Sequence, residues 1–299
     1  MHFGFLFTIV LLVLGSGCRT PTPPRSAQGS TDWLEWRFKR HESIAGTNGW
    51  TTIVARHWLK PGPNTAGSDP TNQLVLPREK ASAIVGTFFR DGQAVRFEAA
   101  SEVDATIGGQ LVTKTDLVSD ASNAPTRLLI GSLAFTIIER GDRIGVRVRD
   151  PDAPGRKRFK GLDCYPYDAR WRIAGHFEPY PSVKTLRVDD ISGGRQDLAS
   201  PGTVVFEHDG DQHRLQVVDE PGEKDLFVIF RDQTAGISTY PSGRFLYVPR
   251  AGADGKVVID FNRAYTPPCG FTAFATCPLP PRQNWLPFAV RAGELDPDH

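Results

Sequence analysis

The sequence has almost no net charge and lacks any surplus of basic residues. Its 299 residues include 35 lysines and arginines against 34 aspartates and glutamates. A protein that binds nucleic acid needs clustered cations that displace counterions from the phosphate backbone. The balance therefore excludes nucleic acid as an expected partner. The chain is long enough to bury one large core or two smaller ones.

The sequence also lacks the motifs by which common catalytic folds are recognised. It contains no G-x-S-x-G nucleophile elbow, no G-x-x-x-x-G-K-[ST] phosphate loop and no G-x-G-x-x-G dinucleotide loop. His41-Glu42 is not followed by a second histidine at metal-ligand spacing, and the seven histidines are scattered. We therefore expect no metal and no cofactor, and the sequence assigns no catalytic residue.

Long hydrophobic runs are missing too, because the apolar segment 3–14 is too short to span a bilayer comfortably. Small residues and Cys18 follow it, which is the anatomy of a signal peptide over residues 1–17. Leu14-Gly15-Ser16-Gly17-Cys18 resembles a bacterial lipobox, in which the cysteine becomes the lipidated first residue. The aliphatic residue stands four places before Cys18 instead of three, and no Lys or Arg precedes the apolar run.

These features predict an exported protein of the bacterial cell envelope. We expect a lipid anchor at acylated Cys18, with the membrane as partner, on the outer membrane or the periplasmic face. A cleaved secreted protein and an uncleaved anchor are the alternatives. Residues 18–31 are rich in Pro, Ser and Gly and predict a flexible tether behind the lipidated cysteine.

Cysteine is scarce, with four residues in the chain. Apart from Cys18 they are Cys164, Cys269 and Cys277. An exported compartment permits disulfides, so Cys269 and Cys277 are disulfide candidates that would close a short loop. Two packed free thiols and a metal pair are the alternatives. Cys164 then has no partner and is expected to be buried and inert.

The pattern of the chain predicts an all-β, antiparallel protein with one N-terminal helix. The helix is expected over residues 32–45, where Asp32-Trp33-Leu34-Glu35 has the form of a capping box. Short alternating or β-branched segments follow, separated by Gly, Pro, Asp and Asn turns, as in sandwiches and barrels. These segments are 51–59, 94–100, 127–140, 143–150, 171–180, 202–210, 213–220, 226–232, 245–249 and 257–265.

The segment DPDAPGRKRFKG, near residues 150–165, divides the strands into two β-rich lobes, 46–158 and 159–299. Its basic part, RKRFK at 156–160, is interpreted as a solvated turn, with an anion patch as the alternative. The irregular segment 260–287 contains six prolines and two cysteines. We expect this segment, called the strap below, to wrap a barrel-like sheet in the C-terminal lobe.

Several polar residues stand at the ends of apolar strand faces, where a barrel mouth or a sandwich rim would hold them. Continued alternation in VVIDFNRAY places Arg263 and Tyr265 on one face and Asp260 and Asn262 on the other. The candidate ligand-binding residues are Arg244, Asp260, Asn262, Arg263, Tyr265, Asp232, Tyr240 and His176.

Two interpretations of these residues compete. In one, Asp232 and neighbouring threonines satisfy a tight turn, and Arg244 or Arg263 pairs with Asp260, so that the polar groups only hold the fold. In the other, they converge on a pocket closed by the strap, where Arg244 or Arg263 binds an anionic ligand bidentately. An enzymatic version uses Asp232 or Asp260 as a general base.

The last third of the chain carries a long motif. Its residues are Asp-Phe-Asn-Arg-Ala-Tyr at 260–265, Pro267-Pro268-Cys269, Phe271-Thr272, Ala275-Thr276-Cys277-Pro278-Leu279-Pro280-Pro281, Asn284, Leu286-Pro287 and Arg291-Ala292-Gly293-Glu294. With upstream matches such as Trp58-Leu59 and Asp232-x-Thr234-x-Gly236, the pattern resembles a bacterial and archaeal domain-of-unknown-function family, numbered 1684, over residues 35–294. Thr266 and Gly270 depart from the family pattern. The resemblance carries no activity over to this chain.

Residues 55–150 also resemble a forkhead-associated-type sandwich, because Pro61-Gly62 and Gly67-Ser68 lead into LVLP and an alternating strand. That module reads phosphothreonine with an Arg after the Gly, a Ser-x-x-His and an Asn-Gly. Here Ser68 stands after the Gly, and Val85 stands where the His is expected. The resemblance therefore implies architecture and not phosphopeptide binding.

Three hypotheses for the function follow. The first is a module that binds a small, anionic or amphipathic ligand in the C-terminal β lobe. The second is a hydrolase-type enzyme that uses an Asp/Arg/Tyr/Asn cluster. The third is a structural envelope protein without a ligand.

Overall fold

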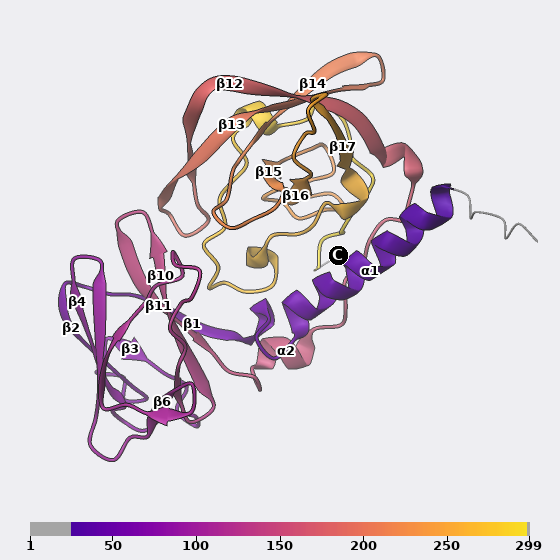
Figure 1. The fold of residues 1–299 in the computed structure, drawn as a ribbon. Coiled ribbons are helices and arrows are strands. Elements are labelled where there is room, and N and C mark those ends of the chain that lie inside the picture. The colour runs from indigo at the N-terminus through magenta and orange to yellow at the C-terminus, as the bar shows by residue number, and fades with distance from the viewer. Residues whose placement is uncertain (1–24, 298–299) are drawn as a thin grey trace, which may run out of the picture.

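Residues 25–297 are described by a computed structural model, which has two β-rich lobes and a long N-terminal helix (Figure 1). Several antiparallel sheets make up most of the fold, which confirms the predicted fold class. No helix within residues 25–297 is long and apolar enough to cross a membrane. The predicted signal peptide at 1–17 and the predicted lipidation site, Cys18, lie outside the described residues.

The N-terminal lobe is a sandwich of two sheets. One sheet has the order β1 (Ile53–Trp58), β11 (Arg143–Arg149), β10 (Leu133–Arg140), β9 (Leu128–Ile130), β6 (Ala105–Ile107) and β7 (Gln110–Leu111). The other has the order β3 (Leu74–Val75), β2 (Gly62–Gly67), β4 (Gly86–Asp91), β5 (Ala94–Ala99) and β8 (Lys114–Leu117). Both sheets contribute to one core, in which the Phe88 ring lies 4.9 Å from that of Phe97 and 6.0 Å from that of Phe135.

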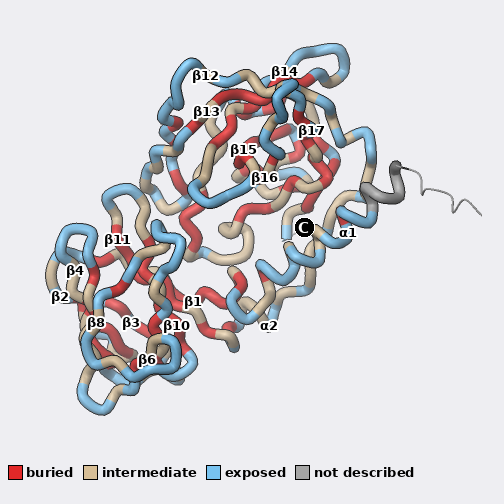
Figure 2. Tube along the Cα trace, in the orientation of Figure 1, coloured by how far each residue is buried: buried red, intermediate tan, exposed pale blue. Residues whose placement is uncertain are grey.

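The C-terminal lobe is built on a curved sheet. Its order is β14 (Asp211–Val217), β13 (Arg195–His208), β12 (Arg172–Asp189) and β17 (Lys256–Asp260). The β12–β13 register shifts between Pro179 and Lys184, because prolines cannot donate to the ladder. The curved sheet covers a two-stranded sheet, β15 (Leu226–Phe230) and β16 (Arg244–Val248), and both contribute to one apolar core. Figure 2 shows this buried centre around β15 and β16.

The helix α1 (Arg25–Ala45) lies along the C-terminal lobe and ends near the linker (Figure 1). It begins seven residues before the predicted start at Asp32, so the predicted tether 18–31 is helical from Arg25 onward. Asp32-Trp33-Leu34-Glu35 therefore lies inside the helix and does not cap it. Trp33 is buried, and its Nε1–H donates to the Asn262 carbonyl oxygen at 2.8 Å, which fastens α1 to the C-terminal lobe.

The linker between the lobes contains a second short helix, α2 (Pro154–Arg158). The basic residues were predicted to form a turn, but Pro154 stands at the helix start, where its missing N–H costs no hydrogen bond. Short 3-10 turns occur at η1 (Trp50–Thr52), η2 (Ala169–Trp171), η3 (Phe261–Arg263), η4 (Pro268–Gly270) and η5 (Arg282–Asn284).

The strap, residues 260–287, runs between the lobes and across the open side of the curved sheet. Arginines of the N-terminal lobe hold it: Arg56 Nη1 donates to the Ala275 carbonyl at 3.0 Å, and Arg140 Nε donates to Thr276 Oγ1 at 3.0 Å. Farther along, the buried Asn284 side chain joins β14 to β15. The strap therefore connects the two lobes and also closes the C-terminal lobe.

Candidate functional site

Asp232 and Arg244 form a buried ion pair inside the C-terminal lobe. Arg244 Nη2 lies 3.0 Å from Asp232 Oδ2, and the same guanidinium donates to the backbone carbonyls of Val290 and Ala292. Asp232 also accepts hydrogen bonds from Val290 N–H at 2.7 Å and from Thr234 Oγ1–H at 2.7 Å. Because both side chains are buried and internally partnered, neither is available to a ligand or to a reaction.

The turn after Asp232 confirms the structural interpretation of that residue. Thr234 Oγ1 lies 2.8 Å from Thr239 Oγ1, and the Gly236 N–H donates to the Thr239 carbonyl. Of the two arginines offered as the partner of Asp260, Arg263 forms that pair, whereas Arg244 pairs with Asp232. The alternative that Arg244 binds an anion is wrong, because its nitrogens face backbone carbonyls.

Asn262 is a third candidate that the structure places in the framework. Its Oδ1 accepts a hydrogen bond from Asp168 N–H at 3.0 Å, and its Nδ2 donates to the Asp168 carbonyl and to Asp260 Oδ1, both at 2.9 Å. The side chain is buried. It therefore fixes the segment before β12 against the end of β17 and has no spare polar atom.

His176 lies on β12, and Tyr240 lies in the loop between β15 and β16. His176 is exposed on β12, with Nε2 at 3.1 Å from Glu178 Oε1. Tyr240 is half-buried beside Cys269, and burial raises the pKa of its hydroxyl. The cysteines in the described part of the chain are free thiols, and Cys269 N–H donates to Cys277 Sγ at 3.3 Å.

The other three candidates, Asp260, Arg263 and Tyr265, line one hollow of about 340 Å³ on the C-terminal lobe. The strand β17 ends at Asp260, whose carboxylate accepts the Asn262 N–H at 3.2 Å and starts the 3-10 turn η3. This turn interrupts the expected alternation, turns Asn262 inward and brings Arg263 and Tyr265 to the same hollow as Asp260. The predicted division of these residues between two faces is therefore wrong.

The hollow, called the aromatic pocket below, has walls that the sequence analysis did not identify. Trp36 of α1 and Tyr247 of β16 supply aromatic surface, and Arg172 of β12 supplies a cation. The rings of Tyr247 and Tyr265 are stacked, with centroids 6.3 Å apart and planes at 15°. The sequence contains a weak indication of Tyr247 as a pocket residue. It is the one residue of the apolar segment FLYVP whose side chain ends in a polar group.

Two half-exposed guanidinium groups flank one carboxylate in the aromatic pocket. Arg172 Nε lies 3.4 Å and Arg263 Nε lies 3.7 Å from Asp260 Oδ2. Arg263 Nε is buried and has no hydrogen-bond partner within residues 25–297. Two cations thus share one anion, which leaves capacity to bind a negatively charged group.

Carboxyl groups lie at the edge and beneath this pocket. The loop after β14 brings Glu223 and Asp225 to its rim, together with Lys224. Beneath the rim, the Tyr247 hydroxyl donates to Glu220 Oε2 at 2.7 Å. Burial raises the pKa of Glu220, and the nearby Glu223 adds to the effect. Desolvation also raises the pKa of Tyr247, so its hydroxyl remains a hydrogen-bond donor.

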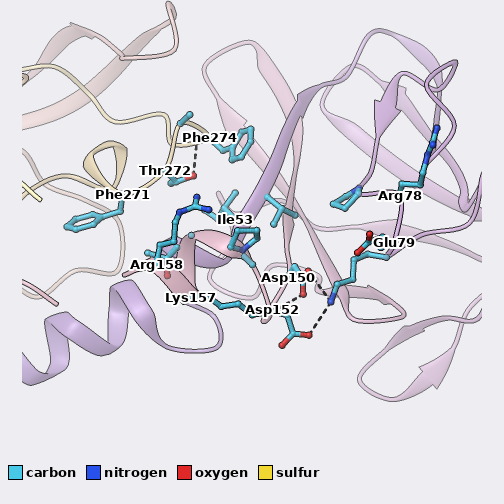
Figure 3. Close-up of a pocket in the computed structure, with 18 residues that line it drawn as sticks. Ile53, Arg78, Glu79, Asp150, Asp152, Lys157, Arg158, Phe271, Thr272 and Phe274 are labelled. Carbon is cyan, nitrogen blue, oxygen red and sulfur yellow. Dashed lines mark hydrogen bonds and ion pairs between the residues drawn. The ribbon is translucent and has the colours of Figure 1, made fainter. Parts of the chain in front are cut away.

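A larger hollow of about 960 Å³ lies between the lobes (Figure 3). Strap residues 271–274, the helix α2, and the N-terminal lobe around Ile53 form its walls. None of the predicted ligand-binding residues lines this interlobe cleft. Within residues 25–297, no group of three or more His, Cys, Asp or Glu side chains is arranged to hold a metal ion.

Fold and site together define a two-lobed, mostly β protein with an aromatic, arginine-bearing pocket on its C-terminal lobe. Residues 157–295 match the family described as "Protein of unknown function (DUF1684)", and the chain belongs to this family over those residues. The N-terminal part of the expected resemblance, from residue 35 to residue 156, lies outside the match.

Solved structures give further similarities. An uncharacterized protein of Haloarcula marismortui, solved by NMR in solution, is 32% identical, with 47% of this chain and 78% of that chain covered and a TM-score of 0.40. A forkhead-associated domain from a study of phosphothreonine-dependent interactions is 18% identical, with 33% and 96% covered and a TM-score of 0.23. The FhaA forkhead-associated domain, in complex with an intracellular domain, is 16% identical, with 31% and 97% covered and a TM-score of 0.23. No curated protein gives a significant match.

Proposed function

We propose that the protein is an exported, lipid-anchored envelope protein whose aromatic pocket binds a small ligand with a flat or apolar body and an anionic group. The main supporting observation is Arg263 Nε, a buried donor beside the stacked rings of Tyr247 and Tyr265. It lies 3.7 Å from Asp260 Oδ2 and has no hydrogen-bond partner within residues 25–297. A buried donor that makes no hydrogen bond is costly and is normally satisfied, here by a bound anion.

The volume and the lining of the pocket limit the size and the chemistry of the ligand. A volume of about 340 Å³ lies at the small end of the range for ligand pockets. Tyr247, Tyr265 and Trp36 offer aromatic surface to the body of the ligand, and Arg172 and Arg263 offer a two-sided cationic contact to its anionic group. Asp260 lies between these cations and would accept hydrogen bonds from hydroxyl or amino groups on the ligand.

Calorimetric titration with benzoate and phenyl phosphate tests binding, because each probe joins one ring to one anion. The protein is purified with Cys18→Ser, which removes the predicted acylation site. We expect saturable binding of at least one probe, weakened about tenfold by Arg263→Gln. Arg187→Gln is the matched control, since Arg187 of β12 pairs with Asp197 of β13 and does not line the pocket. Absence of binding by both probes would favour a structural envelope protein without a ligand.

A hydrolase-type activity at the same pocket is the alternative function, with Asp260 as a general base beside Arg172 and Arg263. Substitution Asp260→Asn separates binding from catalysis, once a bound molecule has been identified by native mass spectrometry. Retained affinity with lost turnover indicates an enzyme. Equal affinity and no turnover in either protein indicates a binding module.

The lipid anchor is tested separately from ligand binding. Cells that express the chain are grown with an alkyne-bearing palmitate, and the label on the protein is read after a click reaction. We expect label on the wild-type chain and none on Cys18→Ser, because lipobox chemistry acylates this cysteine alone. Equal labelling of both chains, or of neither, would contradict the proposed anchor.

A further inference from the structure

The interlobe cleft is lined by apolar surface from both lobes. Phe271 and Phe274 come from the strap, and Ile53 and Val54 come from the start of β1. Phe274 N–H donates to Thr272 Oγ1 at 3.3 Å, which holds this part of the strap in a turn (Figure 3). A volume of about 960 Å³ with such walls is too large for a bare inorganic anion and fits an organic molecule.

The charged groups of the cleft are divided between its two ends. On the side of the N-terminal lobe, Lys80 is neutralised by Asp150 at 3.3 Å and Asp152 at 3.1 Å. Arg78 and Glu79 are exposed neighbours of opposite sign on the same side (Figure 3). These two cations and three carboxylates leave one net negative charge, so this end does not attract an anion.

The helix α2 itself is different, because its three charged side chains, Arg156, Lys157 and Arg158, are all cations. Neither Lys157 nor Arg158 makes a side-chain hydrogen bond or an ion pair within 4.0 Å to any residue of 25–297. Figure 3 shows the Arg158 side chain beside Thr272 and near Ile53, between the apolar walls. The third basic residue of α2, Arg156, is occupied by the Ala45 and Pro151 carbonyls. Arg158 therefore lies next to a phenylalanine-lined wall without an ion-pair partner, whereas the Lys157 side chain extends toward the side of Asp152 (Figure 3).

We propose that the interlobe cleft is a second binding site, which takes an amphipathic anion: a carboxylate or phosphate head bound by Arg158 and Lys157, and an apolar chain laid along Phe271 and Phe274. The pairing of cations with adjacent apolar surface selects for both parts of such a molecule. This site is independent of the aromatic pocket, with which it shares no lining residue. The proposed site corresponds to the anion patch that the sequence offers as the alternative for residues 156–160.

A ligand in this cleft would contact both lobes at once. The lobes are also joined by Arg56 to the Ala275 carbonyl and Arg140 to Thr276 Oγ1, on the strap residues that follow the phenylalanines, and by an ion pair between Arg143 of β11 and Asp190 after β12. Binding should therefore stabilise the arrangement of the lobes, and the apparent unfolding temperature should rise with ligand concentration. Hydrogen exchange should slow in the strap around residues 271–277.

Fluorescence titration with anilinonaphthalene sulfonate, an apolar anion, tests the site on the full chain carrying Cys18→Ser. We expect one saturable site, about tenfold weaker in the double variant Lys157→Gln/Arg158→Gln. Lys160→Gln is the matched control, because Lys160 is an exposed cation close in sequence but outside the cleft. Phe274→Ser should weaken binding as well, and circular dichroism checks that each variant is folded.

Displacement of the probe distinguishes two sources of the ligand. Oleate carries a carboxylate head and oleoyl lysophosphatidate carries a phosphate head on the same chain. Displacement by either one, lost in the Lys157/Arg158 double variant, supports the site and names its head group. Equal probe affinity in the wild type, the double variant and Phe274→Ser would overturn the proposal. Loss of affinity in Arg263→Gln alone would overturn it too, since the probe would then occupy the aromatic pocket.

Discussion

Arg244 Nη2 lies 3.0 Å from Asp232 Oδ2, and the two side chains are only 1% and 2% exposed. The pair connects the end of β15 to the start of β16, and through the Val290 and Ala292 carbonyls it also holds the segment that follows the strap. A charge pair this deep contributes to the fold only while all its partners are present, because each ion was removed from water.

Arg244→Met is therefore expected to destabilise the protein by about 3–5 kcal/mol, since it leaves the Asp232 charge buried and two carbonyls without a donor. Urea unfolding followed by tryptophan fluorescence measures the change. Arg263→Met serves as the comparison, because its pair with Asp260 is half-exposed and should cost less than about 1 kcal/mol. Equal decreases in the free energy of unfolding of the two variants would mean that burial does not make the Asp232–Arg244 pair more important for stability than the Arg263–Asp260 pair.

The thiols of Cys269 and Cys277 are adjacent, with Cys269 N–H donating to Cys277 Sγ at 3.3 Å, and a hydrogen bond with Cys277 lowers the pKa of Cys269. Both are free thiols in the structure, and we expect them to form a disulfide in an oxidising medium, with a gain of about 2.5 kcal/mol from closing the short loop. Intact mass before and after reduction should differ by two hydrogens. Burial raises the pKa of Cys164 to about 11, so this thiol should resist alkylation until the chain unfolds.

Cys164→Ser provides the control for the disulfide, because it should leave the mass difference unchanged. Cys277→Ser should abolish the difference and free Cys269 for alkylation. Recovery of three reactive thiols from unfolded, unreduced protein purified from the envelope would contradict the disulfide. In that event the packed-thiol alternative describes the pair.

Glu220 should make the stability of the protein depend on pH. Burial raises its pKa in the folded state above the ordinary value, so the folded protein holds the proton more tightly than the unfolded chain. The corresponding stability is complete below the ordinary pKa and is lost as the pH rises through the raised one. Glu220→Gln has no proton to lose and still accepts from Tyr247. The variant should therefore gain stability relative to wild type as the pH rises above about 4.3, the ordinary pKa of a glutamate.

Thermal unfolding of wild type and Glu220→Gln across this pH range measures the effect. Glu207→Gln is the matched control, because Glu207 is exposed on β13 and should not alter the pH dependence. Parallel stability curves for wild type and Glu220→Gln would show that Glu220 titrates as it does in the unfolded chain.

Local pattern was sufficient to predict most of the strands. All ten predicted segments contain a strand of the structure, because alternation and turn residues are properties of neighbouring positions. The strands that were not predicted lack that signal: β2 (Gly62–Gly67) has the sequence GPNTAG. The middle of the β12–β13 hairpin was also missed, since prolines interrupt it.

The candidate site was predictable only in part. Strand alternation correctly predicted that Asp232 and Arg244 lie at the ends of apolar strand faces. The same alternation is expected whether such residues line a pocket or form a buried hydrogen-bond network. The deciding partners are the backbone groups of Val290 and Ala292, which belong to a segment without periodicity. The aromatic pocket needed the 3-10 turn after Asp260, and its other walls come from α1 and β16, far away in sequence.

The last prediction concerns Asn284 of the strap, whose side chain joins β14 of the curved sheet to β15 of the two-stranded sheet. Its Oδ1 accepts Gln216 N–H at 2.8 Å, and its Nδ2 donates to the carbonyls of Gln216 and Ile229, both at 2.9 Å. Asn284→Asp keeps the size of the side chain and its acceptor oxygen. It replaces the NH2 group, which donates to two carbonyls, with a carboxylate oxygen that carries a buried negative charge. We expect a loss of about 3 kcal/mol near neutral pH and a smaller loss in acid, where the protonated carboxyl regains one donor.

Denaturant unfolding of Asn284→Asp at about pH 7 and about pH 4 measures both parts of this prediction. Gln283→Ala is the matched control, because the neighbouring Gln283 is exposed and its single hydrogen bond to Gln216 Oε1 contributes little. A loss for Asn284→Asp no larger than that of the control would mean that the strap does not hold β14 and β15 together. Full loss with partial recovery in acid would establish the amide of Asn284 as the group that closes the C-terminal lobe.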